Sequence, residues 1–143
     1  MARINIELPD KFIYSTEIHI RITDINYGGH LAHDSVLSLT HEARVRYLSS
    51  MGFSEGDVDG VGIIISDAAI VYKSEAFYGQ ILVIEISASD FHKYGCDFIY
   101  KLSDKLTGNE IARVKTGIIF FDYKSRKICK VPEGFMKNYD EME

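Results

Sequence analysis

Hydrophobic and polar residues alternate between Glu17 and Thr23, where isoleucines occupy every second position. Side chains of a strand point to opposite faces in turn, so this pattern predicts a strand that is buried on one face. Residues 33–51 instead repeat their apolar side chains at helical spacing, and Gly52 follows where a helix would stop. Because the apolar arc of this predicted helix is wide, we expect the helix to be largely enclosed by the protein.

The second half of the chain has the pattern of strands separated by turn residues. Four strand-like runs are predicted, at 62–73, 81–89, 95–102 and 110–122. A strand, a long helix and then four strands predict an α+β fold, with an antiparallel sheet curled around the helix. Such a sheet has open edges, which pairing in a symmetric dimer would cover.

The length of 143 residues predicts a single domain. We expect its core to run from about residue 15 to 123 and residues 124–143 to form a C-terminal tail. The formal net charge is −5, whereas a nucleic-acid-binding protein would normally carry a basic excess. The composition therefore argues against a nucleic-acid partner.

The cysteines and the apolar runs bear on the cellular compartment. Cys96 and Cys129 lack the spacing of a metal or redox motif and are typical of a reducing cytoplasm. Residues 1–10 contain no apolar signal core, and the longest apolar run, 61–65, is far too short to span a bilayer. We expect a cytoplasmic protein without a membrane segment.

The segment from Thr23 to Leu31, directly before the predicted helix, is where chemistry is expected. Its glycine pair, Gly28 and Gly29, turns the chain and leaves free N–H groups at the start of the helix. Such N–H groups carry partial positive charge and can hold an anion or a developing oxyanion. The alternative is that the glycines only permit a tight reversal of the chain. The polar residues around this turn are Asp24, Asn26, His30, His33 and Asp34.

The order of motifs resembles the hotdog-fold thioesterases of the hydroxybenzoyl-CoA thioesterase type. The resemblance rests on Arg21-x-x-Asp24-x-Asn26-x-x-Gly29-His30-Leu31, on Glu42-Ala43-Arg44, and on a tyrosine, basic residue and glycine turn within residues 71–80. It spans most of residues 17–122. It implies a five-stranded antiparallel sheet wrapped around one long central helix, in a homodimer or a dimer of dimers. It also implies hydrolysis of acyl-CoA or acyl-carrier thioesters without a metal or an organic cofactor.

One residue departs from the family pattern, because Asn26 stands where the catalytic aspartate is usual. An asparagine side chain cannot act as a base at neutral pH, although its amide can orient water or polarise a carbonyl. Asn26 is therefore either a substrate-positioning residue or a turn residue. The two candidate bases nearest to it in sequence are His30 and Asp34, and we favour Asp34. Each also has a structural interpretation, since His30 can lock the turn and Asp34 suits the helix dipole.

Other residues take their expected roles from the resemblance or from their spacing. By resemblance, the acyl carbonyl would meet the backbone N–H of His33, with Gly28 and Gly29 shaping the turn, and Tyr72 and Lys73 would contact substrate. Spacing predicts a surface ion pair between Glu42 and Arg46. The remaining expectations are that Asp24 braces the turn against Arg21 or Arg44, that Asp67 reaches a partner's site, and that the basic segment 124–130 is either solvated or a seat for CoA phosphates.

These observations predict a thioesterase acting on a small or medium acyl group carried by CoA or by a carrier protein. The histidine spacing does not match the helix signature of a zinc site, so no metal is expected. The principal alternative is a non-catalytic acyl-thioester binding module that kept the oxyanion turn and lost the carboxylate. A hotdog dehydratase is a weaker alternative, because the expected Pro-Gly-rich turn is replaced by Tyr27-Gly28-Gly29-His30.

Overall fold

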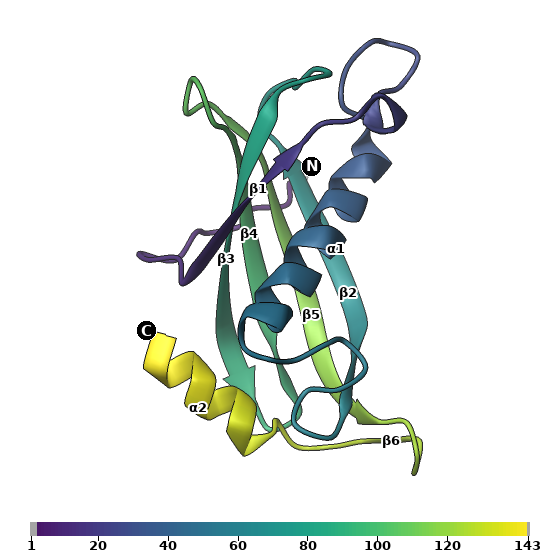
Figure 1. The fold of residues 1–143 in the computed structure, drawn as a ribbon, viewed down its shortest axis with the longest axis vertical. Coiled ribbons are helices and arrows are strands. Elements are labelled where there is room, and N and C mark those ends of the chain that lie inside the picture. Colours follow the sequence, from purple (N-terminus) through teal and green to yellow (C-terminus); the bar gives the residue numbers. More distant parts are fainter. Residues whose placement is uncertain (1–2, 143) are drawn as a thin grey trace.

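The computed structural model describes residues 3–142 and shows a curved antiparallel sheet with one long helix, α1, against one face (Figure 1). Neighbouring strands follow the order β1-β3-β4-β5-β2, and a short strand, β6, pairs with the end of β5. The elements are β1 (Tyr14–His19), a 3-10 turn η1 (Ile22–Asp24), α1 (His33–Ser50), β2 (Gly62–Tyr72), β3 (Ile81–His92), β4 (Gly95–Asp104), β5 (Glu110–Asp122), β6 (Lys127–Ile128) and α2 (Glu133–Met142).

The core lies between α1 and the concave face of the sheet. Alternate residues of β3 to β5 point inward because side chains of a strand alternate between faces, and those on the inner face are at most 2% exposed. They meet one side of α1, where Leu39, Ala43 and Tyr47 are fully buried. The inward-facing strand residues include Leu82, Ile84, Ile86, Phe98, Tyr100, Leu102, Ala112, Val114 and Ile118.

The helix is less enclosed than its sequence pattern predicts. Only seven of its 18 residues are buried in the chain, and Leu37 and Val45 remain 39% and 40% exposed. Its predicted bounds, 33–51, are nevertheless confirmed to within one residue. The expectation of a largely enclosed helix is therefore wrong for the single chain.

The first strand differs from its prediction. It ends at His19 rather than Thr23, and residues 22–24 form the 3-10 turn η1. Asp24 causes the difference, because its buried carboxylate accepts a hydrogen bond from the backbone N–H of Arg21 (2.8 Å) and closes the turn. Ile22, which the alternating pattern places on the buried face, is 66% exposed as a result.

The C-terminal residues are part of the packed structure rather than only a tail. The helix α2 begins just after Pro132 and buries Phe135 completely, with Phe98 and Phe120 beside it. The hydroxyl of Tyr139, one helical turn further on, donates to the backbone oxygen of Ala88 (2.7 Å). The assignment of the core to residues 15–123 is corrected accordingly, because α2 contributes to the same hydrophobic cluster.

The predicted open edge is found at β2, which pairs on one side with β5. Residues 65–68 in the middle of β2 are exposed. Within residues 3–142, none of the helices is both long enough and apolar enough to cross a membrane.

Candidate active site

The loop between η1 and α1 is a tight turn organised by Asn26. The backbone N–H of Asn26 donates to His30 O (3.0 Å), and the N–H of Gly29 donates back to Asn26 O (3.0 Å). The side-chain oxygen Oδ1 of Asn26 accepts from the N–H groups of Gly28 (3.0 Å) and His30 (3.4 Å). Gly29 has a φ of +85°, a conformation that side chains other than glycine's adopt only with strain. Asn26 is thus a turn residue whose oxygen is already engaged.

The loop is held to the rest of the protein on both sides. Asp24 is 3% exposed, and its backbone oxygen accepts from the N–H of Ala32 (2.9 Å). Its carboxylate pairs with Arg21, which confirms one of the two predicted partners. On the other side, the N–H of Leu31 donates to Ala76 O (2.8 Å), so the loop runs against the segment that follows β2.

The first turn of α1 has no side-chain cap. Its N-cap residue is Ala32, whose methyl group cannot accept a hydrogen bond from the helix amides. The hydroxyl of Tyr72 donates to His33 O (3.0 Å) and ties the start of the helix to the end of β2. The positive end of the helix dipole therefore faces this region with its first amides uncapped by a side chain.

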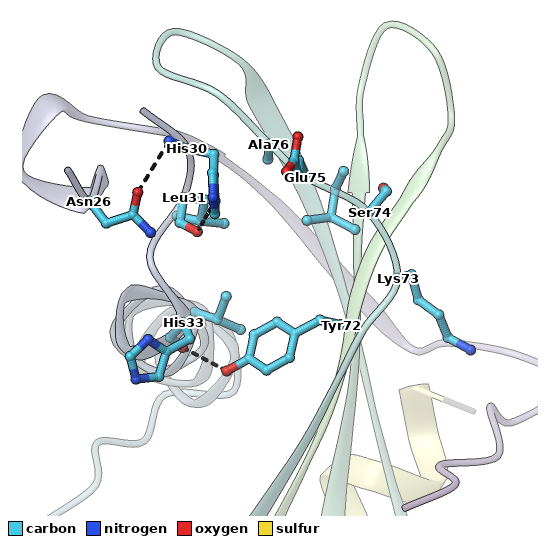
Figure 2. A pocket seen from close by; sticks show the side chains of 11 residues that line it. Asn26, His30, Leu31, His33, Tyr72, Lys73, Ser74, Glu75 and Ala76 are labelled. Atoms are coloured by element: carbon cyan, nitrogen blue, oxygen red, sulfur yellow. Dashed lines mark hydrogen bonds between the residues drawn. The ribbon is translucent and has the colours of Figure 1, made fainter. Parts of the chain in front are cut away.

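A pocket of about 400 Å³ lies between this loop, the start of α1 and the end of β2. Figure 2 shows Asn26 and His30 on one side of it and the segment from Ser74 to Ala76 on the other. Part of its wall is apolar and part is polar. The lining residues are Asn26, His30, Leu31, His33, Val36, Tyr72, Lys73, Ser74, Glu75, Ala76 and Ile111.

The pocket brings together most of the residues singled out in the sequence. Asn26, His30, His33, Tyr72 and Lys73 all line it, although they come from three different segments. The two glycines do not line it and instead shape the turn beside it, since a Cβ on Gly28 would lie 3.2 Å from Asn26 Oδ1.

Asp34 is not among the lining residues. It lies exposed on the first turn of α1, where its charge still acts on the pocket. Partial burial raises the pKa of the Tyr72 hydroxyl, and the nearby charge of Asp34 raises it further. A catalytic role for Asp34 stays a prediction.

Among the titratable residues of the pocket, Glu75 is left without an assigned role by the sequence analysis. Glu75 lies three residues after the end of β2, and among residues 3–142 it is the one carboxylate that lines the pocket. The motif of residues 71–80 was recognised, but only its tyrosine and lysine were assigned to substrate. The proximity of Glu75 to Tyr72 and Lys73 was the available signal.

The basic segment from Lys124 to Lys130 is remote from this pocket. It lies around β6, at the end of the molecule opposite to the start of α1 (Figure 1). A role for this segment in binding CoA phosphates stays a prediction. In the described part of the chain, no group of three or more His, Cys, Asp or Glu side chains is arranged to hold a metal ion.

A second polar cluster lies further along α1. Arg44 is 6% exposed; its Nε donates to Glu55 Oε2 (2.8 Å) and its NH1 group to the hydroxyl of Tyr100 (3.2 Å). The hydroxyl of Tyr100 also pairs with Thr116 Oγ1 (2.8 Å), and His41 Nε2 pairs with Glu55 Oε1 (2.7 Å). Burial alone would raise the pKa of the Glu55 carboxyl, but its bonds to Arg44 and His41 outweigh burial and lower the pKa.

Two other ion-pair expectations have clear outcomes. Arg44 pairs with Glu55 and not with Asp24, so the second suggested partner for Asp24 is wrong. Glu42 and Arg46 form the predicted surface pair (2.9 Å). Asp67 pairs with Lys115 of its own chain (2.7 Å), and its reach toward a partner's site stays a prediction.

The sequence of the chain is similar to that of a known protein family. The model of the thioesterase-like superfamily matches residues 20–139. No curated protein sequence matches the chain.

Several solved structures have the same fold. A 1,4-dihydroxy-2-naphthoyl-CoA thioesterase from Synechocystis is 19% identical, with a TM-score of 0.81 over 90% of this chain and 96% of that one. A DHNA-CoA thioesterase from Staphylococcus aureus is 20% identical, with a TM-score of 0.76 over 90% and 86% of the two chains. A gentisyl-coenzyme A thioesterase is 15% identical, with a TM-score of 0.76 over 86% and 99%.

The chain belongs to the thioesterase-like superfamily, because the family model covers most of its length. The structural similarities confirm the predicted α+β hotdog fold. The predicted resemblance to hotdog thioesterases is confirmed as well.

Proposed function

We propose that this protein hydrolyses the thioester of a small or medium acyl group carried by CoA or a carrier protein. The observation that carries the proposal is the uncapped start of α1 beside a pocket with both apolar and polar walls. Its volume of about 400 Å³ is in the range of small-molecule sites. Membership of the superfamily supports the same reaction class.

The proposed chemistry uses the helix start to stabilise negative charge. As water adds to the thioester carbon, the carbonyl oxygen becomes an oxyanion, which the backbone N–H of His33 would bind. One donor of this kind typically contributes about 3 kcal/mol to the transition state. The side-chain amide nitrogen of Asn26 has no hydrogen-bond partner among residues 3–142 and is free to position the carbonyl or the water. Direct hydrolysis of this kind needs no metal or organic cofactor.

The pocket walls suggest how the substrate lies. Leu31, Val36, Ala76 and Ile111 provide apolar surface for the acyl group, and Tyr72 and Lys73 lie where the chain meets solvent. The test is release of free thiol from a panel of acyl-CoA and aryl-CoA esters. Aromatic esters belong in the panel because two similar structures are named for 1,4-dihydroxy-2-naphthoyl-CoA and gentisyl-CoA.

The second candidate is a non-catalytic module that binds acyl thioesters. It is favoured by the engaged oxygen of Asn26, which leaves the usual position of the catalytic carboxylate without a base. Saturable binding of CoA esters without any thiol release would establish this alternative.

We further propose a homodimer formed through the open side of the molecule. The edge strand β2 and the neighbouring surface of α1 expose Ile65 and Leu37 at about 40% each, and both side chains line the same groove. Covering these side chains and the free edge would be favourable. Light scattering should give two or four times the 16.2 kDa of one chain at micromolar concentration. A fully active monomer would contradict the proposal.

A further inference from the structure

The proposed hydrolysis lacks a base at the position where the family resemblance places one. Asn26 Oδ1 already accepts two backbone N–H groups, and an amide nitrogen does not take up a proton at neutral pH. The water that attacks the thioester must lose its proton to another group. That group must lie in the pocket, within hydrogen-bond reach of the water.

Glu75 is held in the pocket by anchored neighbours on both sides. Before it, Ser74 is fixed twice, since its Oγ donates to Glu110 O (2.7 Å) and its N–H to Ile111 O (3.2 Å). After it, Ala76 is 1% exposed and accepts the hydrogen bond from Leu31. That last bond joins the residue after Glu75 to the residue after His30, so it places the two segments directly against each other.

The carboxylate of Glu75 is free to act. It forms no hydrogen bond or ion pair with any other residue between 3 and 142, in contrast to Glu55 or Glu110, which are bound to arginines. Figure 2 shows Asn26 on the other side of the same pocket, and its free amide nitrogen is available to position the thioester carbonyl.

We propose that Glu75 is the general base of the thioesterase reaction, in place of the missing carboxylate at position 26. This inference rests on the proposed function. Glu75 takes a proton from water while the water oxygen bonds to the thioester carbon and the carbonyl electron pair moves onto oxygen. The oxyanion then re-forms the carbonyl, the carbon–sulfur bond breaks, and the sulfur takes the proton back from Glu75. The products are a carboxylic acid and a thiol, and the Glu75 carboxylate is regenerated.

Other titratable groups around the pocket determine which measurements are informative. His30 enters from the loop, His33 from α1, Tyr72 from the end of β2 and Lys73 from the position after it, while Asp34 lies nearby on α1. A carboxylate base makes the rate fall below about pH 5, whereas a histidine base makes it fall below about pH 7. The pH profile of kcat therefore separates Glu75 from the two histidines, and substitution must separate it from Asp34.

The experiment compares wild type with Glu75→Gln, Asp34→Asn and Glu133→Gln on the best ester of the panel. We expect Glu75→Gln to lower kcat at least 100-fold with less than a threefold change in KM, and to abolish the acidic limb of the profile. Glu133→Gln makes the same chemical change at an exposed position of α2 and should leave kcat unchanged. Thermal unfolding should be unaffected, because the Glu75 side chain is exposed.

A rescue variant separates a catalytic role of Glu75 from a structural one, because a new carboxylate elsewhere in the pocket can restore only a catalytic role. Asn26→Asp in the Glu75→Gln background places a carboxylate on the opposite side of the same pocket and should recover at least tenfold in kcat. The proposal is overturned if Glu75→Gln keeps more than half of kcat, or if its loss is confined to KM. Loss of kcat in Asp34→Asn alone would instead favour the carboxylate predicted from sequence. A wild type that releases no thiol from any ester overturns the proposed function itself.

Discussion

Two polar clusters along α1 use similar residues and differ in how their polar groups are satisfied. Halfway along the helix, Arg44 and Glu55 are bonded to each other and to Tyr100 and His41. At the start of the helix, Asn26 has a free amide nitrogen and Glu75 has no partner among residues 3–142. Buried polar groups that are paired support the fold, whereas groups left unpaired beside a pocket are available to water and substrate. We therefore expect the Arg44 cluster to stabilise the fold and the cluster at the start of α1 to take part in the reaction.

The largest predicted effect is on stability, and it should come from Arg44→Met in the first cluster. It removes the charge that pairs with Glu55 and one partner of the buried Tyr100 hydroxyl, so we expect the free energy of unfolding to fall by about 2 kcal/mol. The cost is below that of a fully buried pair because Glu55 is 30% exposed and keeps His41. Denaturant unfolding measures it. Arg46→Met, at a half-exposed position of the same helix, removes a surface ion pair with Glu42 and hydrogen bonds to Thr16 and Glu17 O; it is the control and should cost less than Arg44→Met.

The assignment is contradicted if Arg44→Met loses kcat at temperatures where it remains folded. Its guanidinium does not line the pocket, so turnover per folded molecule should stay within a factor of two of wild type. A selective loss of turnover would mean that the two clusters are coupled.

The next largest effect is on kcat, and it should come from substitution of Asn26 in the second cluster, at the start of α1. Asn26→Ala removes both the acceptor of two turn N–H groups and the free amide donor, so we expect kcat to fall at least tenfold. Asn26→Asp keeps an oxygen acceptor for the turn and should retain the wild-type unfolding midpoint. Steady-state kinetics and thermal unfolding of both variants check this. An Asn26→Ala enzyme as fast as wild type would leave Asn26 with no part in substrate positioning.

The sequence predicted most of the fold because its signals are local. Alternating runs and turn residues gave β2 and β5 nearly to the residue, and helical spacing gave α1. The site was predicted as far as it lies in contiguous motifs, which includes Asn26, His30 and Tyr72.

The missed features depend on contacts between distant parts of the chain. Glu75 enters the site because the segment between β2 and Ala76 runs against Leu31, and no local pattern encodes that contact. In the same way, Phe135 is buried because α2 folds back over Phe98 and Phe120, although the basic run before it suggested a solvated tail. Neither contact has a periodicity that could be recognised along the chain.

The smallest predicted effect is the pH dependence of the stability that the Arg44 cluster provides. The pKa of the Glu55 carboxyl is lower in the folded protein than in the unfolded chain, where glutamate titrates near about 4.3. The folded state is therefore stabilised by this group above that pH, and the contribution disappears as the pH falls through the lower, folded-state pKa. Wild type should lose stability between pH 5 and pH 3, partly through Glu110 and Asp67, whose pKa values are also lowered by their bonds to Arg113 and Lys115. Arg44→Met retains those two pairs but not the Glu55 pair, so its free energy of unfolding should fall less steeply over the same range. Equal slopes in wild type and Arg44→Met would show that Glu55 contributes nothing to acid sensitivity, and the stabilising role of the cluster would then rest on Tyr100 and Thr116.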